Sequence, residues 1–339
     1  MANQVERHLI TSVDQWMGLR KRDVTASVVG ALFGVHEYKS IYELWHELTG
    51  GPTLPRASNE LMERGNDFEE AVGKRVGRDH PEWKIRKARH YYRHPGLRLG
   101  ATPDFLMTNR NGNRGVLQVK TVSPFSFKRR WTDTLVPQWI ILQTLVEMML
   151  TQSTWGIICA AEIGDNVYRR HYYEVPRNAR AERRIRETVA AFWRAVEAGE
   201  VPKPDYVRDG ALIAAMTMHA KKGSIVDLRA DNRMPLILSE RARLKSEIEK
   251  REKELEAVET EIKDKLGENE TALVNGWTVK VPEVSVAAYT REVKAYSYRK
   301  INAKRDESAP DVPEPMLPLK GEEALEIITG LASKLRGES

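Results

Sequence analysis

Two carboxylates, an amide and a lysine lie in an order that fits metal-assisted hydrolysis of a phosphodiester. Asp104 ends one strand-like segment, and Gln118 and Lys120 lie on the next, where alternate side chains share a face. Glu69, in a preceding helix, could add a second carboxylate, while its competitor Glu70 points about 100° away around the helix. Carboxylates on rigid elements can hold divalent ions beside a scissile phosphate. A nearby lysine can position or deprotonate the attacking water.

These residues require a sheet with helices packed against it. Periodicity and turn signals predict helices over 12–48, 57–77, 137–152 and 178–199, and strands over 84–94, 99–108, 115–122, 154–164 and 167–175. An Asn/Gly-rich turn at 109–113 joins the strands that carry Asp104 and Lys120. The order helix, strands, helix, strands, helix indicates an α/β (α+β) domain over residues 1–208.

The C-terminal third has a different composition, which predicts an arm. We interpret 209–238 as a connector, 239–300 as a long charged helix with a β-hairpin, and 301–339 as a polar tail with a short helix near 322–335. Apolar residues spaced as a coiled-coil seam, with Arg251 in the missing position, follow the helix: Leu244, Ile248, Leu255, Val258 and Ile262. Asn275-Gly276 between two β-prone runs signals the hairpin. The simplest role for this arm is packing or oligomerisation.

The composition favours a soluble protein with an anionic partner. The 339 residues carry a net charge of +6, which makes nucleic acid the first candidate. The single cysteine, Cys159, excludes disulfide bonds within the chain and fits a reducing compartment, so we expect a cytoplasmic location. The longest apolar run, 139–150, is too short for a membrane span and contains Gln143 and Glu147.

The order Glu69, Asp104, Gln118-x-Lys120 resembles the active site of the PD-(D/E)xK nuclease superfamily, and above all the lambda-type exonucleases of the YqaJ viral recombinase family. Five stretches support the likeness: WMGLRKRDVTAS (16–27), RGNDFE (64–69), GATPDFLM (100–107), VLQVKTVSPF (116–125) and WIILQTLVEMMLT (139–151). The likeness covers about residues 12–200 and selects Glu69 over Glu70. It implies a restriction-endonuclease-like core, a central mixed sheet flanked by helices.

The resemblance also implies an activity with its cofactor and partners. Members of that family digest one strand of linear double-stranded DNA from the 5′ end and leave a 3′ single-stranded overhang. They use Mg²⁺, for which Mn²⁺ substitutes, and close into a ring-shaped homotrimer around the DNA. They act with a single-strand annealing protein in phage recombination. For this chain, the resemblance implies a metal-dependent 5′-to-3′ exonuclease in the cytoplasm of a host cell.

Roles for single residues follow from the same resemblance. The metal ligands would be Glu69, Asp104, Gln118 and the backbone carbonyl of Val119. Lys120 would orient the nucleophilic water, and Gln143 would help to place that water or the scissile phosphate. Arg20 and Ser27 would receive the 5′-terminal phosphate, on a shorter matching stretch.

Position 118 departs from the superfamily pattern, which has an acidic residue there. Glutamine offers one neutral carbonyl oxygen, whereas glutamate offers two charged oxygens, which hard divalent cations prefer. Three explanations stay open: the glutamine is natural and tolerated, it is an engineered substitution that suppresses cleavage, or the chain is a naturally inactive DNA-binding relative. In each case one metal site should bind its ion more weakly.

Basic residues beside the site could contact DNA. In the stretch FKRRW (127–131), the phosphate contacts would be Lys128, Arg129 and Arg130, and Phe127 or Trp131 would stack on an unpaired base. The alternative is a solvated basic turn with buried aromatics. Further basic residues could line the same channel: Arg20, Lys21, Arg22 and Arg64. The run at 177–186 is better explained as an outer helix face with Glu182 and Glu187 as partners.

Other functions compete with the exonuclease. A catalytically silent DNA-end clamp would bind tightly and cleave nothing, even after Gln118→Glu. A structure-specific endonuclease on the same fold would nick circular or branched DNA. A scaffold role for the helix at 239–266 leaves the order of Glu69, Asp104 and Lys120 unexplained.

Overall fold

The computed structural model describes residues 5–54, 60–132, 135–219, 221–286 and 301, with the backbone alone for 60–64 and 66. The chain divides into two compact units, Met1–Thr217 and Met218–Ser339, which we describe separately. The helix predicted near 322–335 lies outside the described residues. No helix in the described ranges combines the length and apolar character needed to cross a membrane.

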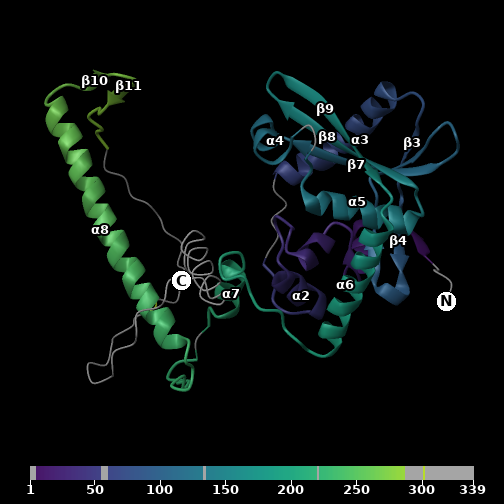
Figure 1. Ribbon diagram of the computed structural model, residues 1–339, viewed down its shortest axis with the longest axis horizontal. Coiled ribbons are helices and arrows are strands. Elements are labelled where there is room, and N and C mark those ends of the chain that lie inside the picture. Colours follow the sequence, from purple (N-terminus) through teal and green to yellow (C-terminus); the bar gives the residue numbers. More distant parts are fainter. Residues whose placement is uncertain (1–4, 55–59, 133–134, 220, 287–300, 302–339) are drawn as a thin grey trace, which may run out of the picture. The chain divides into compact units, whose positions relative to one another are not determined.

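A five-stranded mixed sheet forms the centre of the first unit (Figure 1). Its strands in spatial order are β3 (Lys84–Lys87), β6 (Phe105–Thr108), β7 (Arg114–Val122), β8 (Trp155–Gly164) and β9 (Val167–Pro176). Strands β7 and β8 are parallel, and the other neighbours are antiparallel. Because parallel neighbours need a crossover connection, helix α5 (Gln138–Thr151) links them. The predicted α/β (α+β) core with a mixed sheet flanked by helices is confirmed.

The two faces of β7 point to different helices. Leu117 and Val119 belong to a hydrophobic core that also contains residues of α3 (Glu60–Asp79). Gln118 and Lys120 point to the other face, where Gln143 of α5 contacts both side chains. This arrangement follows from the alternation of side chains along a strand. The predicted common face of Gln118 and Lys120 is therefore confirmed.

A second sheet takes up strand residues that we assigned to the first. It has four strands in the order β1 (Glu6–Leu9), β4 (His90–His94), β5 (Leu99–Ala101) and β2 (Val24–Thr25). The prediction of one continuous strand over 84–94 and another over 99–108 is therefore wrong. Pro103 has no N–H for a ladder bond, and the Ala88 N–H donates to the Asp104 carbonyl at 3.1 Å where both segments change sheet. Asp104 therefore lies where the two sheets meet.

The remaining helices complete the first unit. They are α1 (Val13–Arg20), α2 (Ile41–Thr49), α4 (Pro124–Arg130), α6 (Ala179–Glu197) and α7 (Gly210–Met216), with the 3-10 turns η1 (Val29–Phe33) and η2 (Pro95–Leu97). Within the range 12–48, residues 24–34 are not one helix, because they form β2 and η1. The basic stretch 127–131 is not a turn, since α4 begins after Ser123, whose side chain accepts the Ser126 N–H.

The second unit consists of a long helix and a hairpin. Helix α8 (Met234–Leu266) begins five residues before the predicted start at 239, and β10 (Thr271–Val274) pairs antiparallel with β11 (Trp277–Lys280). Gly276, at φ +80°, occupies the left-handed turn position that the Asn-Gly signal predicted. The apolar seam of α8 is 39–58% exposed: Leu244, Ile248, Leu255, Val258 and Ile262.

Candidate active site

A continuous hydrogen-bonded chain joins four of the predicted site residues. Lys120 Nζ donates to Gln143 Oε1 at 3.2 Å, and Gln143 Nε2 donates to Gln118 Oε1 at 2.9 Å. Gln118 Nε2 in turn donates to Asp104 Oδ2 at 2.6 Å. This hydrogen-bond network spans β7, α5 and the residue that precedes β6, so residues 39 positions apart in the sequence meet in one cluster.

The two residues at the ends of this hydrogen-bond network, Lys120 and Asp104, determine how both amides are oriented. An ammonium group only donates hydrogen bonds, so Lys120 requires the oxygen of Gln143. An ionised carboxylate only accepts, so Asp104 requires the nitrogen of Gln118. Both amides are thus oriented in one direction, with their nitrogens toward Asp104. In this arrangement the carbonyl oxygen of Gln118 faces Gln143, and its role as a metal ligand stays a prediction.

Asp104 has a strongly perturbed carboxyl group. Its Oδ2 accepts the Val119 N–H at 2.8 Å as well as the amide of Gln118. Burial, and next the negative charge of Glu69, raise the pKa of Asp104 to about 7, against the opposing effect of Lys120. A metal-free Asp104 therefore binds a proton far more readily than an exposed aspartate, and a cation at the site would displace that proton.

Glu69 lies near this carboxyl group, whereas Glu70 faces away from it. The Glu69 side chain on α3 is 19% exposed and forms an ion pair with Lys87 of β3. The Glu70 side chain is 67% exposed and pairs with Lys74 one helical turn later, at 2.8 Å. The helix therefore presents Glu69 to Asp104 and Glu70 to its outer surface, which agrees with the choice that the resemblance made.

The sequence analysis missed a third acidic residue beside this hydrogen-bond network. Glu147 on α5 is fully buried, and its Oε1 accepts a hydrogen bond from Gln143 Nε2 at 2.9 Å. Its Oε2 has no hydrogen-bond partner in the described part of the chain. Burial, and next the charge of Asp104, raise the pKa of Glu147 well above its ordinary value. A glutamate four residues after Gln143, in an otherwise apolar run, was the signal that could have revealed it.

The oxygen atoms of the cluster suit a hard divalent cation such as Mg²⁺. Glu69 and Asp104 bring two carboxylates together, and Asp104 accepts the hydrogen bonds of Gln118 and Val119 with Oδ2. The carbonyl oxygen of Val119 lies 3.5 Å from Gln118 Nε2 and belongs to the same cluster. No three Asp, Glu, His or Cys side chains form a metal-binding group in the described ranges. A metal here would rely on two carboxylates and neutral oxygens.

The sequence comparisons identify the part of the chain that carries this cluster. Residues 15–154 match the profile of the YqaJ-like viral recombinase domain. This segment is similar to the YqaJ-like viral recombinase domain. It contains Glu69, Asp104, Gln118, Lys120 and Gln143. The uncharacterized protein YqaJ of Bacillus subtilis (strain 168) is 26% identical over 140 residues, which are 39% of this chain and 40% of that protein. The match therefore spans less than half of the relative's length.

Solved structures resemble the chain over about half of its length. The LHK-Exo complex with dAMP is 22% identical with a TM-score of 0.46, covering 59% of this chain and 99% of that one. The alkaline exonuclease LHK-Exo of Laribacter hongkongensis is 20% identical with a TM-score of 0.45 and the same coverage. A phage related exonuclease of Haemophilus somnus 129PT is 12% identical with a TM-score of 0.40, covering 52% and 94%.

The matched segment also brings the predicted phosphate-binding pair together. Arg20 Nη2 donates to Ser27 Oγ at 3.1 Å, and the Arg20 guanidinium lies 4.6 Å from the centre of the Trp16 ring. His36 Nε2 lies 2.9 Å from the Ser27 carbonyl oxygen. Burial lowers the pKa of His36 to about 4, so the ring is neutral at pH 7 and its Nε2–H donates to that carbonyl. Ser27 is thereby held from both its side chain and its backbone.

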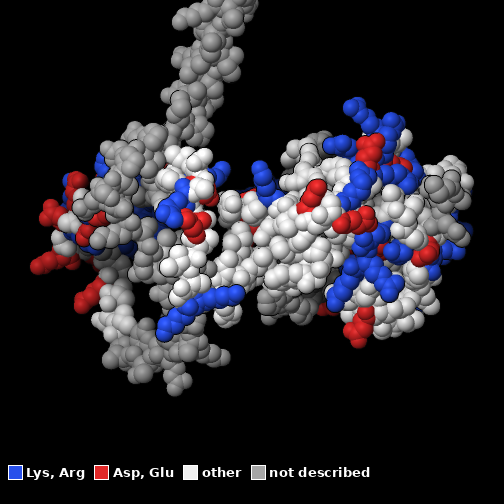
Figure 2. Space-filling view, turned by 90° about the horizontal axis from the view of Figure 1, so that it is seen from below, with Lys and Arg blue, Asp and Glu red and all other residues white. Residues whose placement is uncertain are grey.

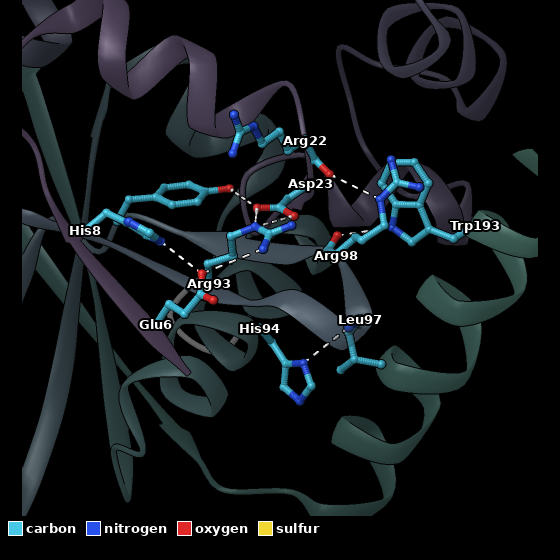
Figure 3. A network of polar contacts seen from close by, with 10 residues as sticks. Glu6, His8, Arg22, Asp23, Arg93, His94, Leu97, Arg98 and Trp193 are labelled. Atoms are coloured by element: carbon cyan, nitrogen blue, oxygen red, sulfur yellow. Dashed lines mark hydrogen bonds and ion pairs between the residues drawn. The ribbon is translucent and has the colours of Figure 1, made fainter. Parts of the chain in front are cut away.

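A buried carboxylate anchors the segment that follows Arg20 (Figure 3). Asp23 accepts hydrogen bonds from Tyr91 Oη at 3.0 Å and from Arg93 Nε at 2.9 Å, both on β4. Beside it, the Arg98 guanidinium lies 3.3 Å from the centre of the Trp193 ring, and Trp193 Nε1 donates to the Arg98 carbonyl at 3.1 Å. These contacts fix the end of α1 against the four-stranded sheet.

The three basic residues of α4 are exposed: Lys128, Arg129 and Arg130. Arg130 also forms an ion pair with Glu37. Trp131 is only 4% exposed and packs against Tyr173, with ring centroids 5.6 Å apart. The expected stacking of Trp131 on a base is therefore wrong for this structure, because the ring belongs to the core. The predicted contact of Arg130 with DNA stays a prediction.

Positive charge is also spread over the outer surface of the first unit. Figure 2 shows a band of Lys and Arg side chains across the body at the right, with a few carboxylates among them. Exposed arginines lie along α6: Arg180, Arg183, Arg184 and Arg194. Glu182, an expected partner of the basic run 177–186, pairs with Arg177, the first residue of that run, with Nη2 and Oε2 2.7 Å apart. No ion pair of Glu187 is recorded within the described ranges.

Proposed function

We propose that the chain is a Mg²⁺-dependent 5′-to-3′ exonuclease that acts on linear double-stranded DNA and leaves 3′ single-stranded overhangs. The observation that carries this proposal is the meeting of Asp104, Lys120 and Gln143 beside Glu69 within the segment that matches the YqaJ-like viral recombinase domain. A carboxyl group with a raised pKa, a second carboxylate and a lysine rarely cluster at one strand for structural reasons alone. Burying these groups together costs free energy.

Each side chain has a defined task in this hydrolysis. Glu69 and Asp104 would hold Mg²⁺, which supplies charge stabilisation and a more acidic water when bound. Lys120 would direct the attacking water and neutralise negative charge that develops on the phosphate. Gln143 Oε1 accepts a hydrogen bond from the Lys120 ammonium group at 3.2 Å and so fixes the position of that charge. The neighbouring Trp139 ring, 5.3 Å from Lys120 Nζ, further confines the ammonium.

The DNA would meet the site through its 5′ end. Arg20 and Ser27 would bind the terminal phosphate, because a guanidinium and a hydroxyl held together suit its oxygens. Lys128 and Arg129, which are exposed on α4, would contact the backbone without reading the sequence. The product would pass to a single-strand annealing protein, and the active form would be a homotrimeric ring. Mn²⁺ would substitute for Mg²⁺, and the reaction would take place in the cytoplasm.

A nuclease assay on end-labelled linear duplex tests this proposal. With Mg²⁺, label at the 5′ end should be released first, 5′-phosphorylated ends should be preferred, and covalently closed circles should survive. EDTA should stop the reaction. Nicking of circles would instead support the structure-specific endonuclease, and release from the 3′ end would contradict the polarity.

One observation favours a second candidate, the catalytically silent DNA-end clamp. The Gln118 amide donates to Asp104 at 2.6 Å, which places a neutral donor where the superfamily pattern has an anionic ligand. A clamp should bind duplex ends in a salt-sensitive way and release no label, with or without Gln118→Glu. An exonuclease weakened by the glutamine should gain activity in that variant, and one that tolerates it should change little.

A further inference from the structure

Helix α5 carries a buried carboxyl group that the proposed mechanism does not use. Glu147 is fully buried, and its Oε2 has no hydrogen-bond partner in the described part of the chain. Among the described residues no lysine or arginine forms an ion pair with Glu147, although the charge of Lys120 opposes the rise in its pKa. Even as a neutral acid, a buried carboxyl group with one oxygen unpaired costs free energy, so a structural role alone explains this residue poorly.

The position of Glu147 relates it directly to the glutamine that breaks the superfamily pattern. Gln143 Nε2 lies 2.9 Å from Glu147 Oε1 and 2.9 Å from Gln118 Oε1. The two oxygens are therefore no farther apart than twice that distance. Gln118, which has 1% exposure, in turn contacts Asp104, the central carboxylate of the cluster. A carboxylate missing from the strand is thus present on the adjacent helix, on the same side of the sheet.

We propose that Glu147 supplies to the metal site the negative charge that is absent at position 118. This inference rests on the proposed function, since it assumes a divalent cation at Glu69 and Asp104. Glu147 acts as a positioning and charge-balancing residue through Gln143 and Gln118, whose amides connect it to Asp104. In a site shielded from water, a negative charge a few ångströms from a cation raises the affinity for that cation.

The substitution Glu147→Gln separates this role from a purely structural one. Glutamine keeps an oxygen that accepts the Gln143 amide hydrogen, but it removes the charge. The variant should fold, because burial and Asp104 raise the pKa of Glu147 and a neutral group there resembles the metal-free state. A structural role predicts unchanged metal binding, whereas a charge role predicts weaker binding.

Calorimetric titration of the full chain with Mn²⁺ measures the effect without relying on activity. We expect Glu147→Gln to raise the dissociation constant for Mn²⁺ about tenfold or more. Gln118→Glu combined with Glu147→Gln, which moves the carboxylate from the helix to the strand, should restore the affinity of the unmodified chain to within about threefold. Glu162→Gln is the matched control, since Glu162 is also buried but contacts His171, and it should leave Mn²⁺ binding unchanged.

Two results would overturn the inference. Unchanged Mn²⁺ affinity in Glu147→Gln would show that the charge does not act on the site. Failure of the combined variant to regain affinity, with its melting temperature preserved, would show that the charge does not replace one at position 118. A chain that binds Mn²⁺ with this pattern but cleaves no DNA would contradict the proposed function alone, and a chain that binds no Mn²⁺ would contradict both.

Discussion

At the scale of single residues, Asp104 determines how the site responds to pH. Its pKa in the metal-free fold is about 7, against 3.8 in an unfolded chain, so the folded state binds more protons between these values. Stability of the metal-free protein should therefore fall as pH rises from about 4 to about 7, and level off above. Because a proton and a cation compete for the same carboxylate, metal affinity should rise over the same range.

Titration of Mg²⁺ or Mn²⁺ binding between pH 5.5 and 8.5 checks this prediction. The dissociation constant should fall by up to about tenfold per pH unit below pH 7 and become nearly constant above it. Asp104→Asn, which cannot ionise, should remove this pH dependence together with most of the affinity. A dissociation constant that does not change with pH in the unmodified chain would be incompatible with Asp104 as a ligand.

Sequence reasoning performed differently for different residues of the site. The alternation of Gln118 and Lys120 could be predicted, because side-chain direction in a strand depends only on local geometry. Glu147 could not, since its meaning depends on the neighbours that tertiary packing brings to it. Trp131 was misplaced for the same reason: an aromatic residue in a basic run suits both a base and a hydrophobic core, and only the fold decides.

At the scale of elements, close packing between α5 and β8 places Gln143 over the sheet. Gly156 of β8 has no room for a β-carbon, which would lie 2.8 Å from Thr144 Cγ2 and 2.9 Å from Met148 Sδ. Gly156→Ala should push α5 away from the sheet and destabilise the protein by about 1–3 kcal/mol. It should also lower the rate of DNA hydrolysis, because Gln143 precedes Thr144 and would move with the helix.

Urea denaturation and the hydrolysis rate together test this prediction. Gly18→Ala is the control, since a β-carbon there would meet nothing within 4 Å and the residue lies in exposed helix α1. That variant should be as stable as the unmodified chain, or more stable by up to about 1 kcal/mol. Equal stability and activity in Gly156→Ala would mean that α5 is not held by this contact.

The link between α1 and the four-stranded sheet depends on Asp23. Removing its carboxylate in Asp23→Ala leaves the Arg93 guanidinium and the Tyr91 hydroxyl without their buried partner. We expect a loss of about 3–5 kcal/mol in the free energy of unfolding. Glu6→Ala is the control: Glu6 also approaches Arg93, at 3.7 Å, but its side chain is 45% exposed. That change should alter stability by less than about 1 kcal/mol.

Urea denaturation of both variants distinguishes the buried pair from the exposed one. Similar small effects for Asp23→Ala and Glu6→Ala would show that burial adds nothing to the network in Figure 3.

Local patterns did predict the helix that ends at Arg20, but not the four-stranded sheet that anchors it. That sheet is assembled from pieces of segments that looked like continuous strands, with β1 contributed from residues 6–9.

At the scale of the whole molecule, the site and the arm belong to different units. Every predicted site residue lies between Arg20 and Gln143, within the unit that ends at Thr217. Contacts inside that unit reach its last helix, where Ser40 Oγ donates to Asp209 Oδ1 at 2.5 Å. Residues 1–217 alone should therefore fold and retain Mg²⁺-dependent hydrolysis at a rate within about threefold of the full chain.

Circular dichroism and the nuclease assay on residues 1–217 check this expectation. A folded fragment without activity, compared with an active full chain, would show that the arm contributes to the site or to the active assembly. The exposed seam of α8 provides a physical reason to measure the oligomeric state of both forms by sedimentation. The heptad spacing predicted this helix well, because its pattern repeats within one element and needs no tertiary information.

The central claim is that Lys120, Asp104 and Glu69 form one metal-dependent hydrolytic site. The most direct measurement is the Mg²⁺-dependent rate of hydrolysis of 5′-phosphorylated linear duplex by the unmodified chain and by Lys120→Met, with DNA-end binding measured alongside. We predict that Lys120→Met lowers the rate at least about 100-fold, while end binding changes little. Full hydrolytic activity in Lys120→Met would contradict the account.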